Sequence, residues 1–286
     1  MLDKPVGLTS HDCVARVRRA YGLRKVGHGG TLDPAVTGVL PLALGPATRL
    51  LPYLEGEKAY VGAIQLGLQT DTDDLQGQTL AQLPVPCLDR ARLDAALEAF
   101  RGPIAQRPPA VSAVHVQGER AYRRVRRGET VELPARMVTI HALRLLRWDP
   151  QASLLELELH CSAGTYVRAL ARDLGERLGC GGALAWLRRT AALGFTLAQS
   201  IPLEALEGTE RPPLLDPLAA LGRFGRYALE PGELGLWRCG RALADPLARP
   251  SGDLVAVLDP LGAWAGIARA DGAGRLLPRL VLDAAG

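Results

Sequence analysis

A glycine-rich stretch from Lys25 to Pro41 most constrains how this chain can fold, because it presents one carboxylate, Asp33, in a predicted loop beside basic residues and a histidine. The glycines before Asp33 allow a positive φ and a close approach of the backbone to a bulky ligand. Pro34 biases Asp33 away from helical geometry toward an extended conformation. A carboxylate presented in this way can act as a nucleophile. The alternative is that Asp33 caps a short apolar helix formed by the residues that follow it.

Length and composition limit the class of protein. The 286 residues can hold one large domain, or one large and one small domain, and the 48% of apolar residues are enough for a substantial core. No apolar run approaches the roughly 18 residues of a membrane span, and the N-terminus lacks the apolar region of a signal peptide. The five cysteines form no C-x-x-C pair, which indicates neither a zinc site nor a disulfide framework. We therefore expect a soluble cytoplasmic protein.

Positive charge is concentrated in one region although the net charge is only +4. Only three of the 34 basic residues are lysines, and the arginines suit bidentate phosphate contacts and stacking on bases. The window 101–147 holds ten arginines and three acids, a formal charge of +7, and its segment 118–128 combines five arginines with one tyrosine. A second basic cluster directly precedes the glycine-rich stretch. This distribution favours a nucleic-acid contact surface over an ordinary solvated face.

The hydrophobic pattern predicts an α/β (α+β) protein. We expect helices that begin near Ser10, after Asp89 and near Thr165, and strands over 60–68, 138–146 and 153–161. From about Phe224 the chain changes to short strands separated by glycine and proline turns, which predicts a small β-rich module. The expected fold is a mixed, largely antiparallel central sheet flanked by helices, with this module at the C-terminus.

Two common kinds of site are not supported by the motifs. The glycine-rich stretch lacks the third glycine of a dinucleotide fingerprint and the Gly-Lys-Ser/Thr ending of a phosphate-binding loop. The acidic run 71–74 has no glutamate at calcium-loop spacing, so a turn with Asx hydrogen bonds is the better interpretation. The five histidines show no ligand pairing, and His160 is expected to be structural because it alternates with apolar residues. The residues predict no nucleotide or metal site.

A series of short motifs occurs in a fixed order across residues 3–200. They are Lys4-Pro5-x-Gly7-x-Thr9-Ser10-His11-Asp12, Lys25-Val26-Gly27-His28 through Thr37-Gly38-Val39-Leu40-Pro41, Gly45-x-Ala47-Thr48-Arg49, Lys58-x-Tyr60 with Leu66-Gly67-x-x-Thr70-Asp71-Thr72-Asp73, Arg107-Pro108-Pro109-Ala110-Val111-Ser112-Ala113, Cys161-Ser162-Ala163-Gly164-Thr165-Tyr166-Val167-Arg168 and Leu187-Arg188-Arg189-Thr190. Together they resemble the TruB family of pseudouridine synthases. The tail resembles, more loosely, the PUA-type RNA-binding module of bacterial members. The resemblance implies a catalytic domain over 1–222, with a basic RNA-gripping insertion at 101–136, and a PUA-like RNA-binding domain over 223–286.

The resemblance implies conversion of uridine 55 in the T-loop of tRNA to pseudouridine. The bond from C1′ to N1 must break, the base must turn, and a bond from C1′ to C5 must form. Asp33 matches the family nucleophile, which attacks C1′ or C6 and needs no cofactor and no metal. Arg168 matches the arginine that pairs with this aspartate and favours its ionised form. The alternative for Arg168, a surface arginine at a helix start, is disfavoured by the helix dipole.

The remaining site residues are also implied by the resemblance. Tyr60 matches the tyrosine that stacks on the target base and is a candidate for handling the C5 proton, although an unperturbed phenol is a poor base; an ordinary strand aromatic is the alternative. His28 matches a residue that contacts the flipped-out loop nucleotides. Tyr166 and Leu187 match pocket-lining residues, and both could equally belong to the core. Lys4 is a candidate for supporting the site or contacting the RNA backbone.

The predicted partner is the T-arm stem-loop of tRNA, with no membrane and no protein partner, and we expect a monomer. Arg123, Arg124 and Arg127 of the basic insertion are the candidates for gripping this arm. Two rival functions remain open at this point. One is a tRNA-binding folding helper whose catalysis is incidental. The other is a glycosidase-like hydrolase, which would require a second carboxylate paired with Asp33, whereas the motifs supply an arginine.

Overall fold

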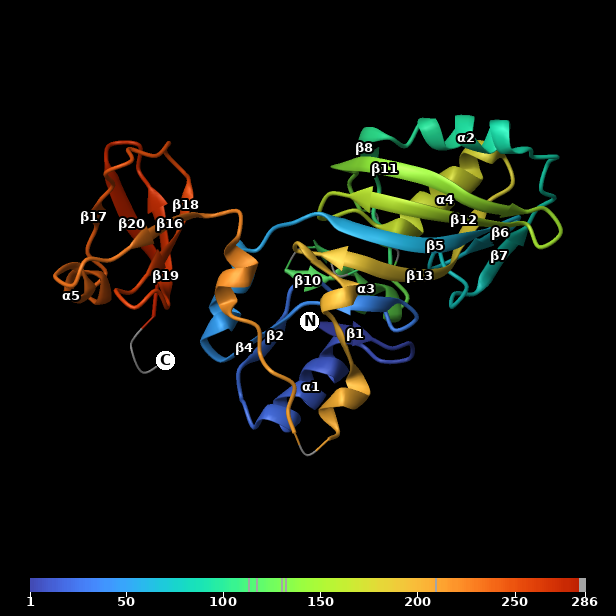
Figure 1. Cartoon of the computed structure of the whole chain (residues 1–286). Coiled ribbons are helices and arrows are strands. Elements are labelled where there is room, and N and C mark those ends of the chain that lie inside the picture. The colour runs from blue at the N-terminus through green and yellow to red at the C-terminus, as the bar shows by residue number, and fades with distance from the viewer. Residues whose placement is uncertain (113, 117, 130, 132, 209, 283–286) are drawn as a thin grey trace. The chain divides into compact units, whose positions relative to one another are not determined.

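A mixed sheet of nine strands is the largest sheet in the computed structural model, which describes residues 1–112, 114–116, 118–129, 131, 133–208 and 210–282 (Figure 1). The strands follow one another across the sheet in the order β15 (Ile201–Pro202), β1 (Leu2–Lys4), β3 (Thr37–Leu40), β13 (Gly182–Ala192), β5 (Lys58–Leu66), β12 (Leu154–Cys161), β11 (Arg136–Asp149) and β8 (Gly102–Gln106), and β14 (Phe195–Thr196) pairs with β13. The pairs β1–β15 and β3–β13 are parallel, and the other pairs are antiparallel. The predicted mixed, largely antiparallel central sheet is confirmed.

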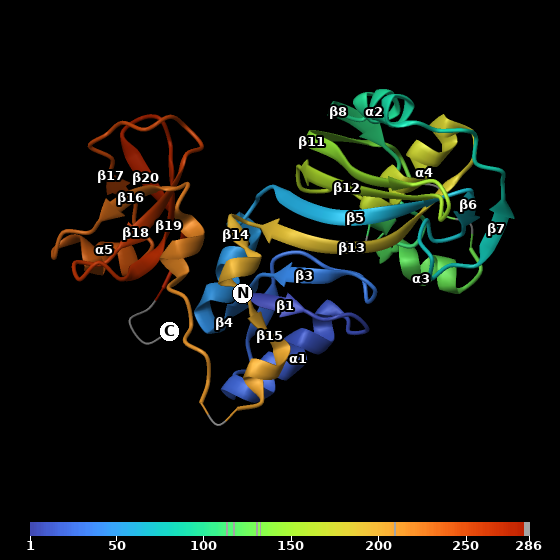
Figure 2. The same ribbon diagram turned by 45° about the vertical axis from the view of Figure 1, so that its right-hand side comes forward.

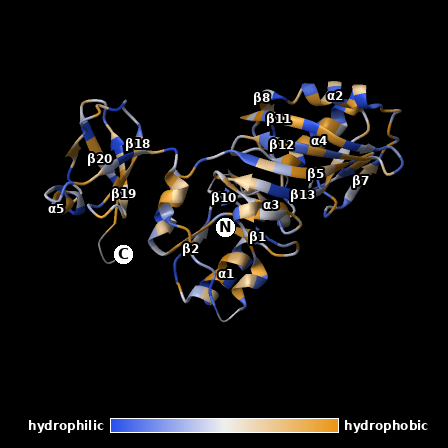
Figure 3. Ribbon diagram, viewed as in Figure 1, coloured by the Kyte–Doolittle hydropathy of each residue, from blue (hydrophilic) through white to orange (hydrophobic). Residues whose placement is uncertain are grey.

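The central strands follow from their alternating side chains. In β12 the leucines at 155, 157 and 159 are fully buried, and the residues between them are partly exposed. Alternation of this kind places one set of side chains in the core and the other on the opposite face. Figure 3 shows hydrophobic and hydrophilic residues mixed along these long strands. The register sets Leu159 of β12 opposite Tyr60 of β5, so the predicted stacking residue lies on a central strand.

Three helices begin where the sequence predicts them. They are α1 (Ser10–Tyr21), α2 (Arg90–Glu98) and α4 (Val167–Leu178). Asp89 caps α2, because its side chain accepts a hydrogen bond from the Arg92 backbone N–H at 2.8 Å. Helix α2 packs on β11, and α4 packs on β13 and β5, as Figures 1 and 2 show from two directions. Arg168 is the second residue of α4, so the sheet and this helix together fix its position.

The other elements are short. They are β2 (Val26–His28), β4 (Leu42–Leu44), η1 (Gly45–Tyr53), β6 (Leu68–Thr70), β7 (Thr79–Gln82), β9 (His115–Val116), β10 (Glu119–Arg120), α3 (Ala121–Arg126), η2 (Leu197–Gln199), η3 (Leu203–Leu206) and η4 (Pro217–Leu221). Strands β2 and β4 pair antiparallel, as do β6 with β7 and β9 with β10. No helix among the described residues is long and apolar enough to cross a membrane.

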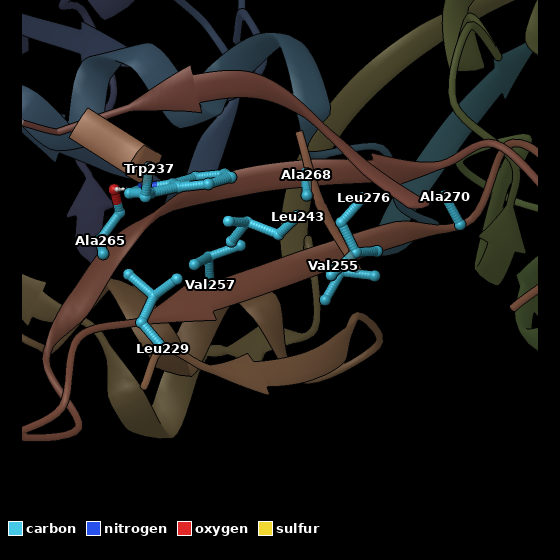
Figure 4. Close-up of a cluster of buried hydrophobic side chains, with 9 residues drawn as sticks. All are labelled: Leu229, Trp237, Leu243, Val255, Val257, Ala265, Ala268, Ala270 and Leu276. Atoms are coloured by element: carbon cyan, nitrogen blue, oxygen red, sulfur yellow. Dashed lines mark hydrogen bonds between the residues drawn. The ribbon is translucent and has the colours of Figure 1, made fainter. Parts of the chain in front are cut away.

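A second sheet of five strands forms near the C-terminus. Its order is β16 (Gly225–Ala228), β18 (Leu254–Leu258), β19 (Trp264–Ala270), β20 (Arg275–Val281) and β17 (Leu243–Ala244), and helix α5 (Glu233–Arg238) precedes β17. Figure 4 shows its core, in which the fully buried Trp237 lies among small and branched apolar side chains. The indole N–H of Trp237 donates to the backbone oxygen of Ala265 at 3.0 Å, so this buried polar atom is paired. The predicted β-rich texture of this region is confirmed.

The chain forms two compact units whose composition differs from a simple cut along the sequence. One unit contains Met1–Cys13, Gly30–Pro41 and Glu55–Leu203, and the other contains Val14–Gly29, Leu42–Leu54 and Glu204–Gly286. Leu50 of η1 shows why, because it packs in one buried cluster with Phe224 and Ile267 of the C-terminal part. The division into a catalytic domain over 1–222 and a PUA-like domain over 223–286 stays a prediction.

Candidate active site

Asp33 lies in a turn directly before β3, and it does not cap a helix. Its backbone oxygen accepts a hydrogen bond from Val36 N–H at 3.0 Å, which closes the turn. Ser10, the first residue of α1, fixes the preceding residue: its hydroxyl accepts from Leu32 N–H at 2.9 Å and donates to Leu32 C=O at 3.2 Å. The helix that the sequence suggested after Asp33 is wrong, because that stretch pairs instead as β3 and β4. A short apolar run does not by itself distinguish helix from strand.

Lys4 organises the same loop from within the protein. It is fully buried, and its ammonium donates to the backbone oxygens of Pro5 at 2.8 Å, Leu8 at 2.6 Å and Pro34 at 3.3 Å. Burial lowers the pKa of Lys4, and the nearby negative charge of Asp33 acts in the opposite direction. Three carbonyls use the three donors of this ammonium. These contacts support the first of its two predicted roles, support of the site, and contact with RNA stays a prediction.

Asp33 and Arg168 form an ion pair, with 3.0 Å between Nη2 and Oδ2. The Arg168 side chain is only 9% exposed, whereas that of Asp33 is 44% exposed. The guanidinium also donates to the backbone oxygens of Thr72 at 2.9 Å and Val111 at 3.0 Å, and its Nε lies 3.7 Å from Oδ2 of Asp74. A guanidinium held in this way from several sides keeps a fixed orientation. Asp33 therefore meets a preoriented cation on one side and remains accessible on the other.

The acidic turn at 71–74 supports this cation. An Asx hydrogen bond is present as predicted at Asp74, which accepts from Gln76 N–H at 3.0 Å, and Asp71 accepts from the more distant Gln78 N–H at 2.8 Å. Asp73 has a positive φ of 60° and pairs with Arg172 at 2.9 Å. Burial raises the pKa of Asp73 to about 6, against the opposing effect of the Arg172 charge. Among the described residues, no group of three or more His, Cys, Asp or Glu could hold a metal ion.

Tyr60 is buried on β5, directly opposite Arg189 of β13 in the sheet register. Burial raises the pKa of Tyr60 to about 12, and the Arg189 charge lowers it in part. Leu187 is buried and lies two residues before Arg189 on the same strand, so its side chain shares the face of β13 that carries Arg189. Lys58, two residues before Tyr60, has its pKa lowered by burial and then by the Arg189 charge.

Tyr166 links the ion pair to the basic insertion. As the residue before α4, it is held by Gln106, whose amide donates to Tyr166 C=O at 3.1 Å and whose oxygen accepts from Tyr166 N–H at 2.8 Å. Its ring packs against a small buried cluster of Val114, Ala121 and Leu133. Burial raises the pKa of its phenol, and the charges of Arg168 and Asp33 also act on it. The predicted pocket-lining role stays a prediction.

The predicted RNA-gripping arginines are paired with acids of the same insertion. Arg124 Nε lies 2.6 Å from Glu129, and Arg127 forms ion pairs with Glu119 at 2.7 Å and with Glu129 at 2.8 Å. All of these side chains are partly exposed. The side chain of Arg123 lies outside the described part of the structure. Contact of these arginines with RNA stays a prediction, and it would require them to exchange carboxylates for phosphates.

His28 belongs to β2, which pairs with β4 at Leu42, and it lies in the unit that includes the C-terminal sheet. Its contact with loop nucleotides stays a prediction. Sequence reasoning did not select Arg189, Asp74 or Lys58 as site residues. Two signals were available, since Arg189 lies in the quoted motif 187–190 and Lys58 begins the motif that contains Tyr60.

Comparison with known proteins adds the family. A family model described as "TruB family pseudouridylate synthase (N terminal domain)" matches residues 18–167, and one described as "tRNA pseudouridylate synthase B C-terminal domain" matches residues 168–213. A relative called tRNA pseudouridine synthase B, from Parasynechococcus marenigrum (strain WH8102), is 59% identical over 287 residues, which cover 100% of this chain and 97% of the relative. A protein of that name from Synechococcus sp. (strain WH7803) is 56% identical, with the same coverage. A chain in a crystal structure of a Cbf5-Nop10-Gar1 complex aligns with a TM-score of 0.72 at 24% identity, covers 99% of this chain and 82% of its own length, and supports the fold alone.

Proposed function

The chain belongs to the TruB family of pseudouridylate synthases, and from that premise we propose that it converts uridine 55 in the T-loop of tRNA to pseudouridine. The observation that carries this proposal is the ion pair between Asp33 and Arg168. Asp33 keeps 44% of its side chain exposed while its counter-ion is almost fully buried. A carboxylate with this arrangement can meet a substrate from outside without losing its partner.

The reaction is an isomerisation in which every atom is kept. The bond from C1′ to N1 breaks, the uracil ring turns, and a bond from C1′ to C5 forms, while C5 loses its proton and N1 ends with one. Asp33 is the nucleophile, and its attack at C1′ or at C6 gives a covalent intermediate that later releases the carboxylate. Arg168 orients this carboxylate through the ion pair from its buried side. The chemistry draws on side chains alone.

Tyr60 is assigned to stacking on the flipped base. Burial raises its pKa to about 12, so even less of it is ionised at neutral pH than of a free phenol. Because so little phenolate is present, Tyr60 is a poor general base for the C5 proton. The aromatic ring, in contrast, offers a surface for a base whatever the protonation state of the oxygen. Leu187 on the neighbouring strand is the proposed apolar wall of the same pocket.

The substrate is held by regions outside this pocket. Extruding a base costs a few kcal/mol, which contacts to the loop and its phosphates must offset. We assign these contacts to His28, Tyr166 and the arginines of the basic insertion, and to residues 223–286 as a PUA-like module. The enzyme would act on the T-arm as a monomer in the cytoplasm.

Release of tritium from tRNA labelled as [5-³H]uridine tests the proposal, because C5 loses its hydrogen only when isomerisation occurs. Wild-type protein should release tritium and Asp33→Asn should not. Asp94→Asn is the matched control, since Asp94 is also 44% exposed and also pairs with an arginine, Arg90, at 3.5 Å. This control should keep wild-type release. Binding of tRNA by the wild-type protein without any release would refute the enzyme and favour a tRNA-folding helper.

A further inference from the structure

Arg189 is a fully buried side chain to which the proposed chemistry assigns no task. It lies directly opposite Tyr60 in the register of β13 and β5, and its positive charge acts on the phenol. Its Nε donates to the backbone oxygen of Val39 at 2.7 Å, and its Nη2 donates to that of Gly30 at 3.1 Å. One planar group therefore contacts the glycine-rich loop and the strand that follows Asp33, and its charge acts on the proposed stacking residue.

These contacts hold the chain on both sides of Asp33. Gly30 precedes Asp33 in the loop, and Val39 follows it in β3. The backbones of β3 and β13 also lie close together at this point, because a Cβ added at Gly38 would lie 2.1 Å from the backbone oxygen of Arg189. Gly38 has a φ of +105°, so this close approach of β3 to β13 depends on glycine. The loop that carries Asp33 is therefore tied to Arg189 before and after the carboxylate.

Packing alone does not account for an arginine at this position. Its guanidinium donates to neutral backbone oxygens, and no Asp or Glu of the described residues forms an ion pair with it. Lys58 adds a second positive charge close by, since its Nζ lies 4.0 Å and Arg189 Nη1 lies 3.5 Å from a Cβ added at Gly30. A buried charge without a counter-ion destabilises a fold. What the guanidinium supplies is several rigidly spaced donors, which an apolar side chain or an ammonium cannot supply.

We propose that Arg189 is a positioning residue that fixes the ring of Tyr60 relative to Asp33. This inference rests on the proposed function, because it requires Tyr60 to stack on the base that Asp33 attacks. The guanidinium fixes the position of the Tyr60 side chain on β5, and it also fixes the loop that carries Asp33. Misplacement of a reacting group by about 1 Å can cost on the order of 100-fold in rate. Arg189 therefore acts on the turnover step and leaves tRNA binding unchanged.

A double-mutant cycle between Arg189→Lys and Tyr60→Phe tests this role, with kcat and KM measured by tritium release from labelled tRNA. Arg189→Lys keeps the charge but loses the fork of donors, so kcat should fall about 30-fold while KM stays within about threefold. Tyr60→Phe keeps the ring and removes the phenol oxygen on which the Arg189 charge acts. In that background Arg189→Lys should lower kcat by only about threefold, because the link to the phenol is already broken.

A structural role without positioning gives a different pattern. It predicts equal losses of kcat in both backgrounds, and that result overturns the inference. If Arg189→Lys does not fold, the cycle is run with Arg189→Gln instead. A Tyr60→Phe variant that keeps wild-type kcat overturns the inference by itself. Arg188→Lys is the matched control on the same strand, because Arg188 is 39% exposed and pairs with Asp3; it should change kcat less than about twofold.

Failure of this inference can be told apart from failure of the proposed function. If wild-type protein releases tritium and Asp33→Asn does not, the proposed function stands whatever the cycle gives. If Asp33→Asn releases tritium at the wild-type rate, the proposed function fails first.

Discussion

Replacement of Arg168 by glutamine removes the positive charge beside Asp33, and its effect can be estimated from the geometry. Arg168 Nη2 lies 3.0 Å from Asp33 Oδ2 and orients this carboxylate from its buried side. Without that contact the carboxylate loses its fixed orientation, and misplacement of a reacting group by about 1 Å can cost on the order of 100-fold in rate. We therefore expect kcat to fall on the order of 100-fold. KM for tRNA should change little, because the RNA contacts are assigned elsewhere.

The same substitution should also destabilise the fold. It leaves the backbone oxygens of Thr72 and Val111 without their donors and Asp74 without its nearby cation. Loss of a buried charged partner of this kind costs on the order of 3 kcal/mol. Urea unfolding at a fixed temperature measures this, and kcat is measured under conditions where the variant remains folded.

Two comparisons make the test specific. Arg168→Lys keeps a charge but cannot reach all of these partners, so its kcat should lie between those of the wild type and Arg168→Gln. Arg90→Gln removes an arginine that is 67% exposed from its pair with Asp94, and it should leave both kcat and stability unchanged. An Arg168→Gln variant that folds and keeps kcat within about threefold of the wild type would refute the assigned role of the ion pair.

Three other perturbations give distinct results. Gly38→Ala should lower the free energy of unfolding by roughly 3 kcal/mol, because the new Cβ would collide with a backbone oxygen of β13; Gly222→Ala, with open space around it, should be nearly neutral in the same urea titration. The phenol of Tyr60 should ionise near pH 12 instead of 10, so the difference in absorbance at 295 nm between wild type and Tyr60→Phe should stay flat to about pH 11 while the protein is folded. Because folding raises this pKa, the stability that the buried phenol contributes is complete below pH 10 and is lost as the pH rises toward 12. A step in the absorbance difference near pH 10 in the folded protein would contradict the burial of the Tyr60 side chain. Glu129→Gln should free the arginines it pairs and strengthen tRNA binding at low salt, whereas Arg127→Gln should reduce the slope of log K against log salt by about 0.9; an unchanged slope would exclude a phosphate contact by Arg127.

Sequence reasoning reached those parts of the site that local pattern controls. The helix that begins near Thr165 is amphipathic over three turns, and this pattern places Arg168 at its start, where the structure has it. The strand that carries Tyr60 is also where its alternation predicts it. The pairing of Asp33 with Arg168 came from the family resemblance, because nothing local to either residue shows which distant side chain it meets.

The misses have physical reasons. The residues after Asp33 are short, apolar and compatible with a helix, and only their place between β1 and β13 makes them a strand. Arg189 escaped notice because β13 is irregular between Leu184 and Trp186 and again after Arg189, which breaks its alternation. The positive formal charge of the basic insertion indicated contact with nucleic acid, but counting charges does not tell which acids its arginines pair with.

The measurement that tests the account most directly is the mapping of pseudouridine in tRNA treated with wild-type protein, Asp33→Asn and Asp94→Asn. Circular dichroism and tRNA binding would first establish that all three proteins fold and bind. We expect pseudouridine at nucleotide 55 with the wild type and with Asp94→Asn, and unmodified uridine there with Asp33→Asn. Pseudouridine at nucleotide 55 made by Asp33→Asn at the wild-type rate would contradict the assignment of Asp33 as the nucleophile.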